Sequence, residues 1–321
     1  MKVLITGGAG FLGSHFCDAL IARGDQVVCL DIGTTDKVAH LLDDENFSFV
    51  RGSVLDKDLV DQQVKECDAV MHLAAVVGVD SVLSGVLRNL QVNIHGTENV
   101  LEAAYKYGKK VLFSSTSEIY GRNPKVPWTE EDDLVIGATH IGRWSYAISK
   151  AAGEHLCFAY ADRGLKMAIV RYFNVYGPRL DTIGTGRVVS VFVGQALKGE
   201  PLTVIGDGQQ TRCFTYVDEA VAATLAALEK PEAEGKVFNI GNDQETTIIE
   251  LARLVRELTG NVSEIVFVPK QSRYGGHFED IPRRVPDITR MRTILGVEPT
   301  IDVREGLSRT LDWYREHRPV E

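Results

Sequence analysis

The first half of the chain alternates short apolar runs, rich in β-branched residues, with longer stretches in which apolar positions recur at helical spacing. The apolar runs predict six strands, at Val3–Thr6, Gln26–Asp31, Phe47–Arg51, Ala69–Leu73, Lys110–Ser115 and Met167–Phe173. The longer stretches predict helices, of which the clearest are Leu12–Arg23, Lys57–Lys65, Leu90–Lys106 and Ser145–Arg163. Strands that alternate with helices form parallel sheets, and right-handed crossovers place the helices on both faces. We therefore expect an α/β fold with a doubly wound parallel sheet.

The regular alternation ends after Phe173. The segment Asn174–Gly186 is rich in Gly, Pro and Asp and predicts a loop. Later apolar runs are short and interleaved with helices, at Leu202–Ile205, Lys236–Ile240 and Ile265–Val268. This pattern predicts a smaller, discontinuous C-terminal domain packed against the strand ends. We place the first domain at residues 1–173, with a returning segment at about 213–240, and the second at residues 174–212 and 241–321.

The composition is typical of a folded globular protein, since 44% of the 321 residues are hydrophobic and 25% are charged. The 44 acidic residues exceed the 35 Lys and Arg, and the net charge of −9 excludes a general attraction to nucleic acid or anionic lipid. Any bound phosphate must therefore be held by local groups. No apolar run approaches the roughly 20 residues of a membrane span, and Met1 leads directly into a strand. We expect a soluble, cytoplasmic protein without nucleic-acid or membrane partners.

The cysteines and histidines form no recognisable disulfide or metal-binding pattern. The five cysteines are odd in number and contain no Cys-x-x-Cys pair, and the eight histidines show no metal-ligand spacing. We expect buried, reduced thiols and no metal site. His72, at the end of a predicted strand, and Cys213, which has no neighbouring base to activate it, are interpreted as core residues.

A glycine-rich segment, Gly-Gly-Ala-Gly-Phe-Leu-Gly at residues 7–13, leads from the first predicted strand into the first predicted helix and has three glycines spaced three apart, at positions 7, 10 and 13. Gly7 permits a tight turn, Gly10 lets the backbone approach a pyrophosphate, and Gly13 lets the helix pack closely on the strand. This arrangement predicts a Rossmann-type dinucleotide site, in which the helix start at Phe11 and Leu12 faces the phosphates. The alternative is a purely structural glycine turn.

Further residues are spaced to complete such a site. Asp31 ends the second strand, eighteen residues after the last of the three glycines, where a carboxylate can accept hydrogen bonds from an adenosine ribose. It would repel a 2′-phosphate and no Arg follows it closely, so we predict NAD rather than NADP, although Asp31 could also be a strand-end turn residue. Leu73, Ala74 and Ala75 close the fourth strand and suit a backbone that lies against a cofactor. Asn93 is either a polar anchor against the sheet or a solvated helix residue.

Tyr146 and Lys150 are one helical turn apart and therefore share a helix face. A tyrosine must be made acidic to act as a base near neutral pH, and an ammonium one turn away favours the phenolate. Thr116 follows the strand Lys110–Ser115, at the edge where open α/β sheets bind ligands, and could hydrogen-bond a substrate hydroxyl. The three residues predict a proton-abstraction site beside a hydride acceptor.

Six segments carry a resemblance to a known family, both by their residues and by their order along the chain: Gly7–Gly13, Leu73–Ala75, Ser115–Gly121, Tyr146–Lys150, Arg171–Pro178 and Arg212–Asp218. In this order, over nearly the whole chain, the sequence resembles the extended short-chain dehydrogenases/reductases of the nucleotide-sugar epimerase/dehydratase class. The resemblance implies that Tyr146 deprotonates a sugar C4 hydroxyl while hydride passes to tightly bound NAD, giving a 4-keto sugar. NADH later returns the hydride, so that one oxidation supports epimerisation, dehydration or decarboxylation.

The residues after Thr116 narrow the reaction. Relatives that eliminate water across C5–C6 carry an Asp–Glu pair there, whereas this chain has Ser117 and Glu118, and a serine cannot be the acid that protonates the leaving hydroxyl. Ser117-Glu118 resembles the arrangement in UDP-glucuronic acid decarboxylases. Three further sets of residues are similar to motifs of that subgroup: Gly142–Tyr146, Tyr274–Asp280 with Arg284–Asp287, and Gly177–Arg179 with Gly186–Ser190. We predict a UDP-glucuronate decarboxylase, with a 4-epimerase of a UDP-sugar or UDP-glucuronate as the alternative.

The resemblance implies the remaining site residues. The additional cofactor contacts are Ser53, Val54 and Tyr172, beside Tyr146 and Lys150. The implied substrate-binding residues are Glu118, Asn174, Arg179, Arg187, Val188, Arg212, Tyr274 and Arg284. The implied catalytic residues are Thr116, Ser117, Glu118, Tyr146, Lys150 and Arg284. Because the chain is acidic, its arginines must supply positive charge locally for a carboxylate and a diphosphate. For any one of these arginines alone, a surface ion pair is the better interpretation. The coincidence with the family motifs reverses this for Arg212 and Arg284.

The sequence also bears on two other functions, a redox sensor and a simple dehydrogenase, and on the oligomeric state. A redox sensor that keeps only the NAD fold would need a broken Tyr146–Lys150 pair, and both residues are present. A simple dehydrogenase would release NADH during turnover, which the internal redox cycle does not. Members of the resembled family usually pair through two helices, so we expect a homodimer formed by the helices Leu90–Lys106 and Ser145–Arg163. The same apolar stripes could instead be core.

Overall fold

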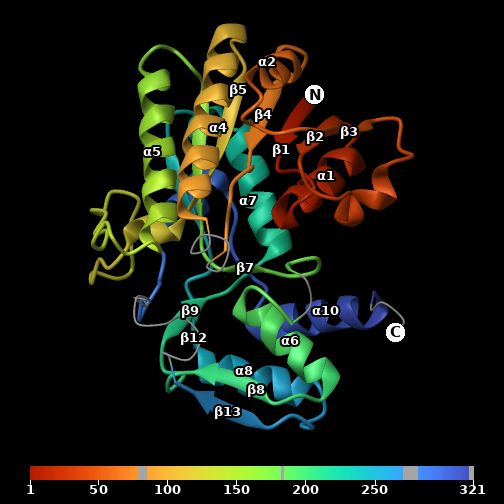
Figure 1. Ribbon diagram of the computed structural model, residues 1–321, viewed down its shortest axis with the longest axis vertical. Helices are drawn as coiled ribbons and strands as arrows, with labels where there is room; N and C mark the ends of the chain where they lie inside the picture. The colour runs from red at the N-terminus through yellow and green to blue at the C-terminus, as the bar shows by residue number, and fades with distance from the viewer. Residues whose placement is uncertain (79–84, 182–183, 270–280, 318–321) are drawn as a thin grey trace.

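A computed structural model describes residues 1–78, 85–181, 184–269 and 281–317. Its centre is a seven-stranded sheet in which all neighbouring strands are parallel, in the order β11-β6-β5-β4-β1-β2-β3 (Figure 1). The strands are β1 (Lys2–Thr6), β2 (Gln26–Asp31), β3 (Phe47–Arg51), β4 (Ala69–His72), β5 (Lys110–Thr116), β6 (Met167–Tyr172) and β11 (Val237–Ile240). All six strands predicted in the first half are present, and the α/β class is confirmed.

Helices cover both faces of this sheet. On one face lie α2 (Lys57–Lys65), α4 (Val86–Tyr107) and α5 (Trp144–Ala161), and on the other lie α1 (Phe11–Ala22) and α7 (Val217–Glu229) (Figure 1). Each strand of a doubly covered parallel sheet is buried on both sides. Every residue of β6 is accordingly buried, and so is β1 after its first residue.

The helix boundaries differ slightly from the predicted ones. The helix predicted at Leu90–Lys106 begins four residues earlier, at Val86, and ends at Tyr107. Gly108 follows it with a φ of +64°, a left-handed conformation that glycine adopts without strain and that stops the helix. No helix in the described ranges is both long and apolar enough to span a membrane.

The smaller part of the molecule is built from short strand pairs and three helices below the sheet in Figure 1. Its strand pairs are β7 (Val175–Tyr176) with β10 (Thr215–Tyr216), β9 (Thr211–Cys213) with β12 (Glu245–Thr247), and β8 (Leu202–Ile205) with β13 (Ile265–Val268). Its helices are α6 (Val188–Lys198), α8 (Ile248–Leu258) and α10 (Val303–Glu316). Between the elements of this part, α7 and β11 return to the large sheet.

The prediction of a loop throughout Asn174–Gly186 is wrong at one place, because β7 lies within it. A strand of two residues is too short to produce an alternating pattern, and only its pairing with β10 makes it visible. Short helical turns complete the described elements: η1 (Asp36–Leu41), η2 (Ser117–Tyr120), η3 (Pro231–Ala233) and η5 (Met291–Leu295).

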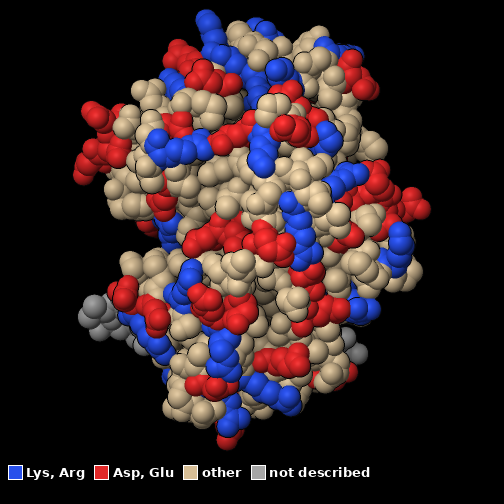
Figure 2. Space-filling view, turned by 180° about the vertical axis from the view of Figure 1, so that it is seen from behind, with Lys and Arg blue, Asp and Glu red and all other residues tan. Residues whose placement is uncertain are grey.

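The distribution of surface charge and the state of the cysteines can be compared with the sequence predictions. On the face shown in Figure 2, acidic and basic side chains are interspersed, and no continuous basic region covers it. All five cysteines are free and buried, as their number and spacing predicted.

Candidate functional site

A cavity of about 1240 Å³ lies at the carboxyl ends of the sheet strands, between the sheet and the smaller part of the molecule. Most of the site residues predicted from the sequence line it: Gly7, Gly10, Phe11, Leu12, Gly13, Asp31, Ser53, Val54, Leu73, Ala74, Ala75, Thr116, Ser117, Glu118, Tyr146, Tyr172, Asn174, Arg187, Val188, Arg212 and Arg284. Because the carboxyl ends of parallel strands meet at one edge, residues from several of the predicted motifs line the same cavity.

The glycine-rich turn after β1 is built so closely that side chains do not fit. A Cβ on Gly13 would lie 2.3 Å from the Gly7 carbonyl oxygen, and one on Gly7 would lie 2.7 Å from the Ala74 nitrogen. Gly7 also has a φ of +75°, and its N–H donates to the Leu30 carbonyl at 2.8 Å. The turn therefore brings bare backbone and the start of α1 to the cavity. Such a cradle fits a pyrophosphate, because the first N–H groups of a helix lack intrahelical acceptors.

Asp31 both shapes the turn and faces the cavity. Its carboxylate accepts hydrogen bonds from the Ala9 N–H at 3.0 Å and from the Gly33 N–H at 2.8 Å. These two hydrogen bonds confirm that Asp31 is a strand-end turn residue. Since Asp31 also lines the cavity, the remaining acceptor capacity of its carboxylate is placed where a ribose could use it.

Asn93 does not line the cavity but fixes part of its wall. It is buried, accepts a hydrogen bond from the Val76 N–H at 2.8 Å and donates to the Ser149 hydroxyl at 3.0 Å. Of the two interpretations, the polar anchor is correct and the solvated residue is wrong. Through these bonds Asn93 holds the segment after β4, whose Val76 lines the cavity, against α5.

Lys150 is buried behind the cavity wall. Its ammonium donates to the Ser114 carbonyl oxygen on β5 at 2.7 Å. Burial lowers the pKa of Lys150 to about 8, against smaller upward effects of Cys157 and Glu154. The lysine is thus largely protonated at neutral pH and joins α5 to the strand that carries Thr116.

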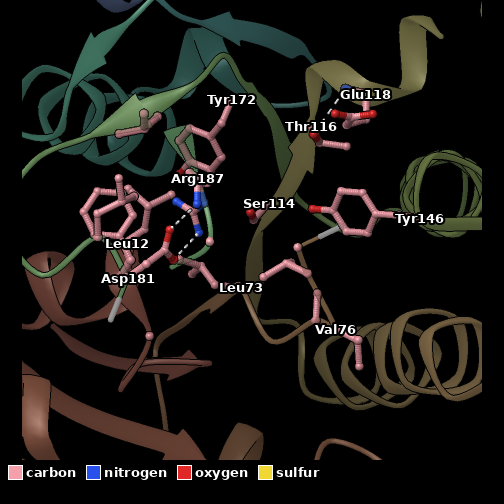
Figure 3. Close-up of a pocket in the computed structure, with 18 of the residues that line it drawn as sticks. Leu12, Leu73, Val76, Ser114, Thr116, Glu118, Tyr146, Tyr172, Asp181 and Arg187 are labelled. Carbon is pink, nitrogen blue, oxygen red and sulfur yellow. Dashed lines mark hydrogen bonds and ion pairs between the residues drawn. The ribbon is translucent and has the colours of Figure 1, made fainter. Parts of the chain in front are cut away.

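Tyr146 reaches from α5 toward Ser114 and Thr116 at the end of β5 (Figure 3). Burial and the negative charge of Glu118 raise the pKa of its phenol, while the charge of Arg187 and a hydrogen bond with Thr116 oppose them. The expected acidic shift of this tyrosine is not seen, because burial and Glu118 outweigh the opposing groups. Lys150 directs its ammonium to the Ser114 carbonyl.

Glu118 is held by two arginines from different segments. Its Oε2 accepts from Arg143 Nη2 at 2.9 Å, and its Oε1 forms an ion pair with Arg284 Nη2. Burial raises the pKa of Glu118, but the charges and hydrogen bonds of Arg284 and Arg143 outweigh it and lower the pKa to about 2. All three side chains line the same end of the cavity as Thr116 and Tyr146.

Arg143 is a site residue to which the sequence reasoning assigned no role. It precedes α5, and its guanidinium lies 4.9 Å from the centre of the Trp144 ring. Arg143 lies in the segment Gly142–Tyr146, which resembles a motif of the decarboxylases, but the sequence could not show that its guanidinium contacts Glu118. Arg88, Gln91, Asp181 and Gln210 also line the cavity and were not predicted.

Arg187 and Arg179 have different surroundings. Arg187 lines the cavity above the Phe11 ring and pairs with Asp181 at 3.5 Å (Figure 3). Arg179 does not line it, because its guanidinium pairs with Asp18 at 2.5 Å and donates to the Lys37 carbonyl at 3.0 Å. The structure therefore does not bring Arg179 to the predicted substrate side. Tyr274 lies outside the described residues.

Two residues interpreted as core are confirmed as such. His72 is buried and hydrogen-bonded on both ring nitrogens, to the Thr6 hydroxyl at 2.7 Å and the Thr97 hydroxyl at 3.0 Å. Burial lowers its pKa to about 3, with a further contribution from Lys150. Cys213 is buried, and burial raises the pKa of its thiol to about 12. Among the described residues, no group of three or more His, Cys, Asp or Glu is placed to hold a metal ion.

Comparison with known proteins adds a family and its members. A family model described as the NAD dependent epimerase/dehydratase family matches residues 3–241. The chain is 43% identical to the UDP-N-acetyl-alpha-D-glucosaminuronate decarboxylase of Bacillus cytotoxicus, over 98% of both chains. It is 37% identical to UDP-glucuronic acid decarboxylase 1 of Xenopus tropicalis, over 98% of this chain and 72% of that one.

Solved structures agree with this match. The UDP-glucuronic acid 4-epimerase from Bacillus cereus, in complex with UDP-glucuronic acid and NAD, superposes with a TM-score of 0.87. The two chains are 30% identical, over 98% of this chain and 99% of that one. The whole described architecture, and not only the sheet, thus has a solved counterpart.

Proposed function

Since this chain belongs to the NAD-dependent epimerase/dehydratase family, we propose that it is a UDP-hexuronate decarboxylase that acts through a 4-keto sugar. The family is the one that the sequence motifs indicated, and NAD is its cofactor. The substrate is a UDP-linked sugar acid, either UDP-glucuronate or its 2-acetamido analogue. Both choices rest on relatives of 37% and 43% identity whose names state those activities.

One observation supports an acidic sugar most strongly. Arg143 and Arg284 converge on the cavity wall that also carries Thr116 and Tyr146. A hydride-transfer site for a neutral hexose has no need of two buried guanidinium groups beside the reacting carbons. Guanidinium groups bind carboxylates through short, charge-assisted hydrogen bonds. The arginines therefore suit a substrate with a carboxyl group at C5.

The cofactor side of the cavity fits a dinucleotide along its length. The cradle of Gly7, Gly10 and Gly13 would hold the pyrophosphate, and Asp31 the adenosine ribose. When bound, NAD supplies the hydride acceptor for C4 of the sugar and, after decarboxylation, the hydride donor.

The residues of the chain then move protons around that redox cycle. Tyr146 takes the C4 hydroxyl proton as its phenolate, a form that the positive charges of bound NAD and of Lys150 would favour. Thr116 hydrogen-bonds the same C4 oxygen. The resulting 4-keto uronate is a β-keto acid, so the C5–carboxylate bond breaks with its electron pair moving onto the C4 oxygen. Tyr146, now protonated, and Thr116 hold this enolate oxygen. C5 takes up one proton, and Tyr146 returns its proton to the C4 oxygen when C4 is reduced.

The overall reaction consumes one proton and releases one carbon dioxide. Arg284 holds the carboxylate only until the bond breaks, since carbon dioxide is neutral. A 4-epimerase would stop at the keto stage and reduce the opposite face of C4. The Bacillus cereus 4-epimerase, similar over nearly the whole chain, makes this the second candidate.

The decisive experiment is to incubate the purified protein with NAD and either UDP-glucuronate or UDP-2-acetamido-2-deoxy-glucuronate. Proton NMR of the sugar and an assay of released carbon dioxide are followed together. Carbon dioxide with a UDP-pentose supports the decarboxylase. A UDP-uronate inverted at C4, without carbon dioxide, establishes the epimerase and overturns the proposal. Stoichiometric NADH without a pentose would make the protein a simple dehydrogenase.

We further propose that the enzyme is a cytoplasmic homodimer formed by the outer faces of α4 and α5. Val100 and Leu101 belong to the apolar stripe of α4 and are completely buried within the chain, so they are core residues. The exposed large apolar side chains of these two adjacent helices are instead Leu87, Tyr105 and Phe158. Light scattering of the purified protein measures its mass, and a monomer at micromolar concentration would reject the dimer.

A further inference from the structure

Arg143 is the most deeply buried member of the cluster formed by Glu118, Arg143 and Arg284, which we call the carboxylate cluster. Its side chain is only 5% exposed and lies against Trp144, one of the largest fully buried side chains in the molecule. It is anchored directly before α5, the helix that also carries Tyr146. Arg143 therefore has little freedom to follow a ligand.

Arg284 carries an unused donor. Its Nε is buried and has no hydrogen-bond partner among the described residues, while its Nη2 contacts Glu118. A buried donor without an acceptor costs about 1–3 kcal/mol, so an unpartnered Nε in a cavity wall indicates a place for an acceptor. Its loop is joined to the chain at Trp128, whose N–H donates to the Val285 carbonyl at 2.8 Å.

Glu118 divides its two oxygens between these arginines, one oxygen for each. If Arg284 turns from Glu118 to an incoming carboxylate, Glu118 stays paired with Arg143. Without Arg143 the same movement would leave a largely buried carboxylate unpaired, which is strongly unfavourable. Arg284 would then remain on Glu118, and a substrate carboxylate could not take it.

We propose that Arg143 is a specificity-determining positioning residue, which keeps Glu118 paired and thereby frees Arg284 to bind the carboxylate of a sugar acid. This inference rests on the proposed function, since it needs a substrate with a carboxyl group. The proposal assigns different roles to the two arginines, although both contact Glu118. Arg284 meets the substrate, and Arg143 makes that exchange possible.

The test compares binding of acidic and neutral sugars in variants that do not turn over. In the NAD-loaded Tyr146→Phe protein, calorimetry measures the Kd of UDP-glucuronate and of UDP-glucose, with the 2-acetamido pair as a second set. Adding Arg143→Gln is expected to weaken the UDP-uronate by about 10- to 100-fold, the range of a charge-assisted hydrogen bond. UDP-glucose should change by less than about threefold, because it does not compete for Arg284.

A second substitution gives a readout that a structural role would not produce. In the Arg143→Gln/Glu118→Gln protein no carboxylate holds Arg284, so UDP-uronate affinity should recover most of the loss, as in a double-mutant cycle. Arg143→Lys, which keeps one charge on Glu118, should retain most of the affinity. Arg283→Gln is the matched control, because Arg283 neighbours Arg284 in sequence but pairs with Glu245 and is exposed.

Each outcome decides the inference. Equal loss for acidic and neutral sugars on Arg143→Gln, or no recovery in the double variant, overturns it while leaving the proposed function intact if the wild-type enzyme releases carbon dioxide. Equal affinity of the site for UDP-glucuronate and UDP-glucose, and likewise for the 2-acetamido pair, would also overturn the inference. Only a wild-type enzyme that releases no carbon dioxide from either UDP-uronate would overturn the proposed function. A melting curve for each variant confirms that the compared proteins are folded.

Discussion

The two ends of the cavity are built in opposite ways. At the cofactor end, seven consecutive residues after β1 make a turn from bare backbone, in which a Cβ on Gly13 would lie 2.3 Å from the Gly7 oxygen. At the sugar end, Glu118, Arg143 and Arg284 come from separate segments and meet through charged side chains. The cofactor end requires glycines that have no Cβ atom, whereas the sugar end requires oppositely charged side chains that pair with one another.

This difference has physical consequences. The glycine turn holds its shape through short backbone contacts and hydrogen bonds, which do not change with pH or with the charge of the ligand. The carboxylate cluster responds to both, because each of its members is an ion in a partly buried site. Added volume should therefore damage the cofactor end most, whereas altered charge should damage the sugar end most.

The largest effect is expected from Gly13→Ala. The added methyl group would overlap the Gly7 oxygen and force the turn apart, so NAD affinity should fall at least about 100-fold. Calorimetry or the NAD content of the purified protein measures this. Gly108→Ala is the control, because its Cβ would meet open space and cost only about 1 kcal/mol of backbone strain at a φ of +64°. Similar NAD affinity in both variants would contradict this account of the turn.

Tyr146→Phe is expected to lower turnover by about 100- to 10,000-fold while NAD and the nucleotide sugar still bind. The change removes one hydroxyl and leaves the ring that lines the cavity in place. Steady-state rates and calorimetric Kd values separate the two effects. A variant with near wild-type turnover would remove Tyr146 from the proton-transfer step.

Lys150→Met tests a charge buried between the two ends. The pKa of Lys150 is lowered from 10.5 to about 8, so between these values the unfolded state binds more protons and wild-type stability rises with pH. Relative to the variant, the free energy of unfolding of the wild type should increase by about 3 kcal/mol from pH 8 to 10.5. Urea unfolding at several pH values measures the difference. If the free energies of unfolding of the two proteins change in parallel with pH, the pKa of Lys150 is not lowered in the folded state.

Arg284→Ala should have the smallest effect, and a selective one. We expect kcat/KM for UDP-uronates to fall about 10- to 100-fold, whereas the Kd of UDP-glucose should change by less than about threefold. The contrast with Gly13→Ala is that cofactor binding stays intact. Equal losses for acidic and neutral sugars would instead place Arg284 on the diphosphate.

The sequence was most informative where neighbours along the chain make the structure. The strands of the first half follow from their apolar runs, and the glycine turn follows from spacing within seven residues. Tyr146 and Lys150 are on one helix, so their common side was predictable as well. In each case the relevant distance is set by the geometry of a single element.

Where long side chains could choose among partners, the sequence was not sufficient. Asn93 had two interpretations until its bonds to Val76 and Ser149 decided between them. Arg179 was predicted on the substrate side, but Asp18 and the Lys37 carbonyl compete successfully for its guanidinium. The direction of the Lys150 ammonium was likewise set by the Ser114 carbonyl.

The amino-acid sequence by itself thus determined the parallel α/β architecture, the cofactor turn and the identity of the residues that can carry chemistry. Those features depend on local periodicity and on which residue types tolerate a given backbone. Only the tertiary structure decided that Glu118 lies between Arg143 and Arg284, since these three residues are far apart along the chain. Charged side chains pair with whatever the folded chain brings within a few ångströms, and that proximity is a property of the packing rather than of sequence spacing.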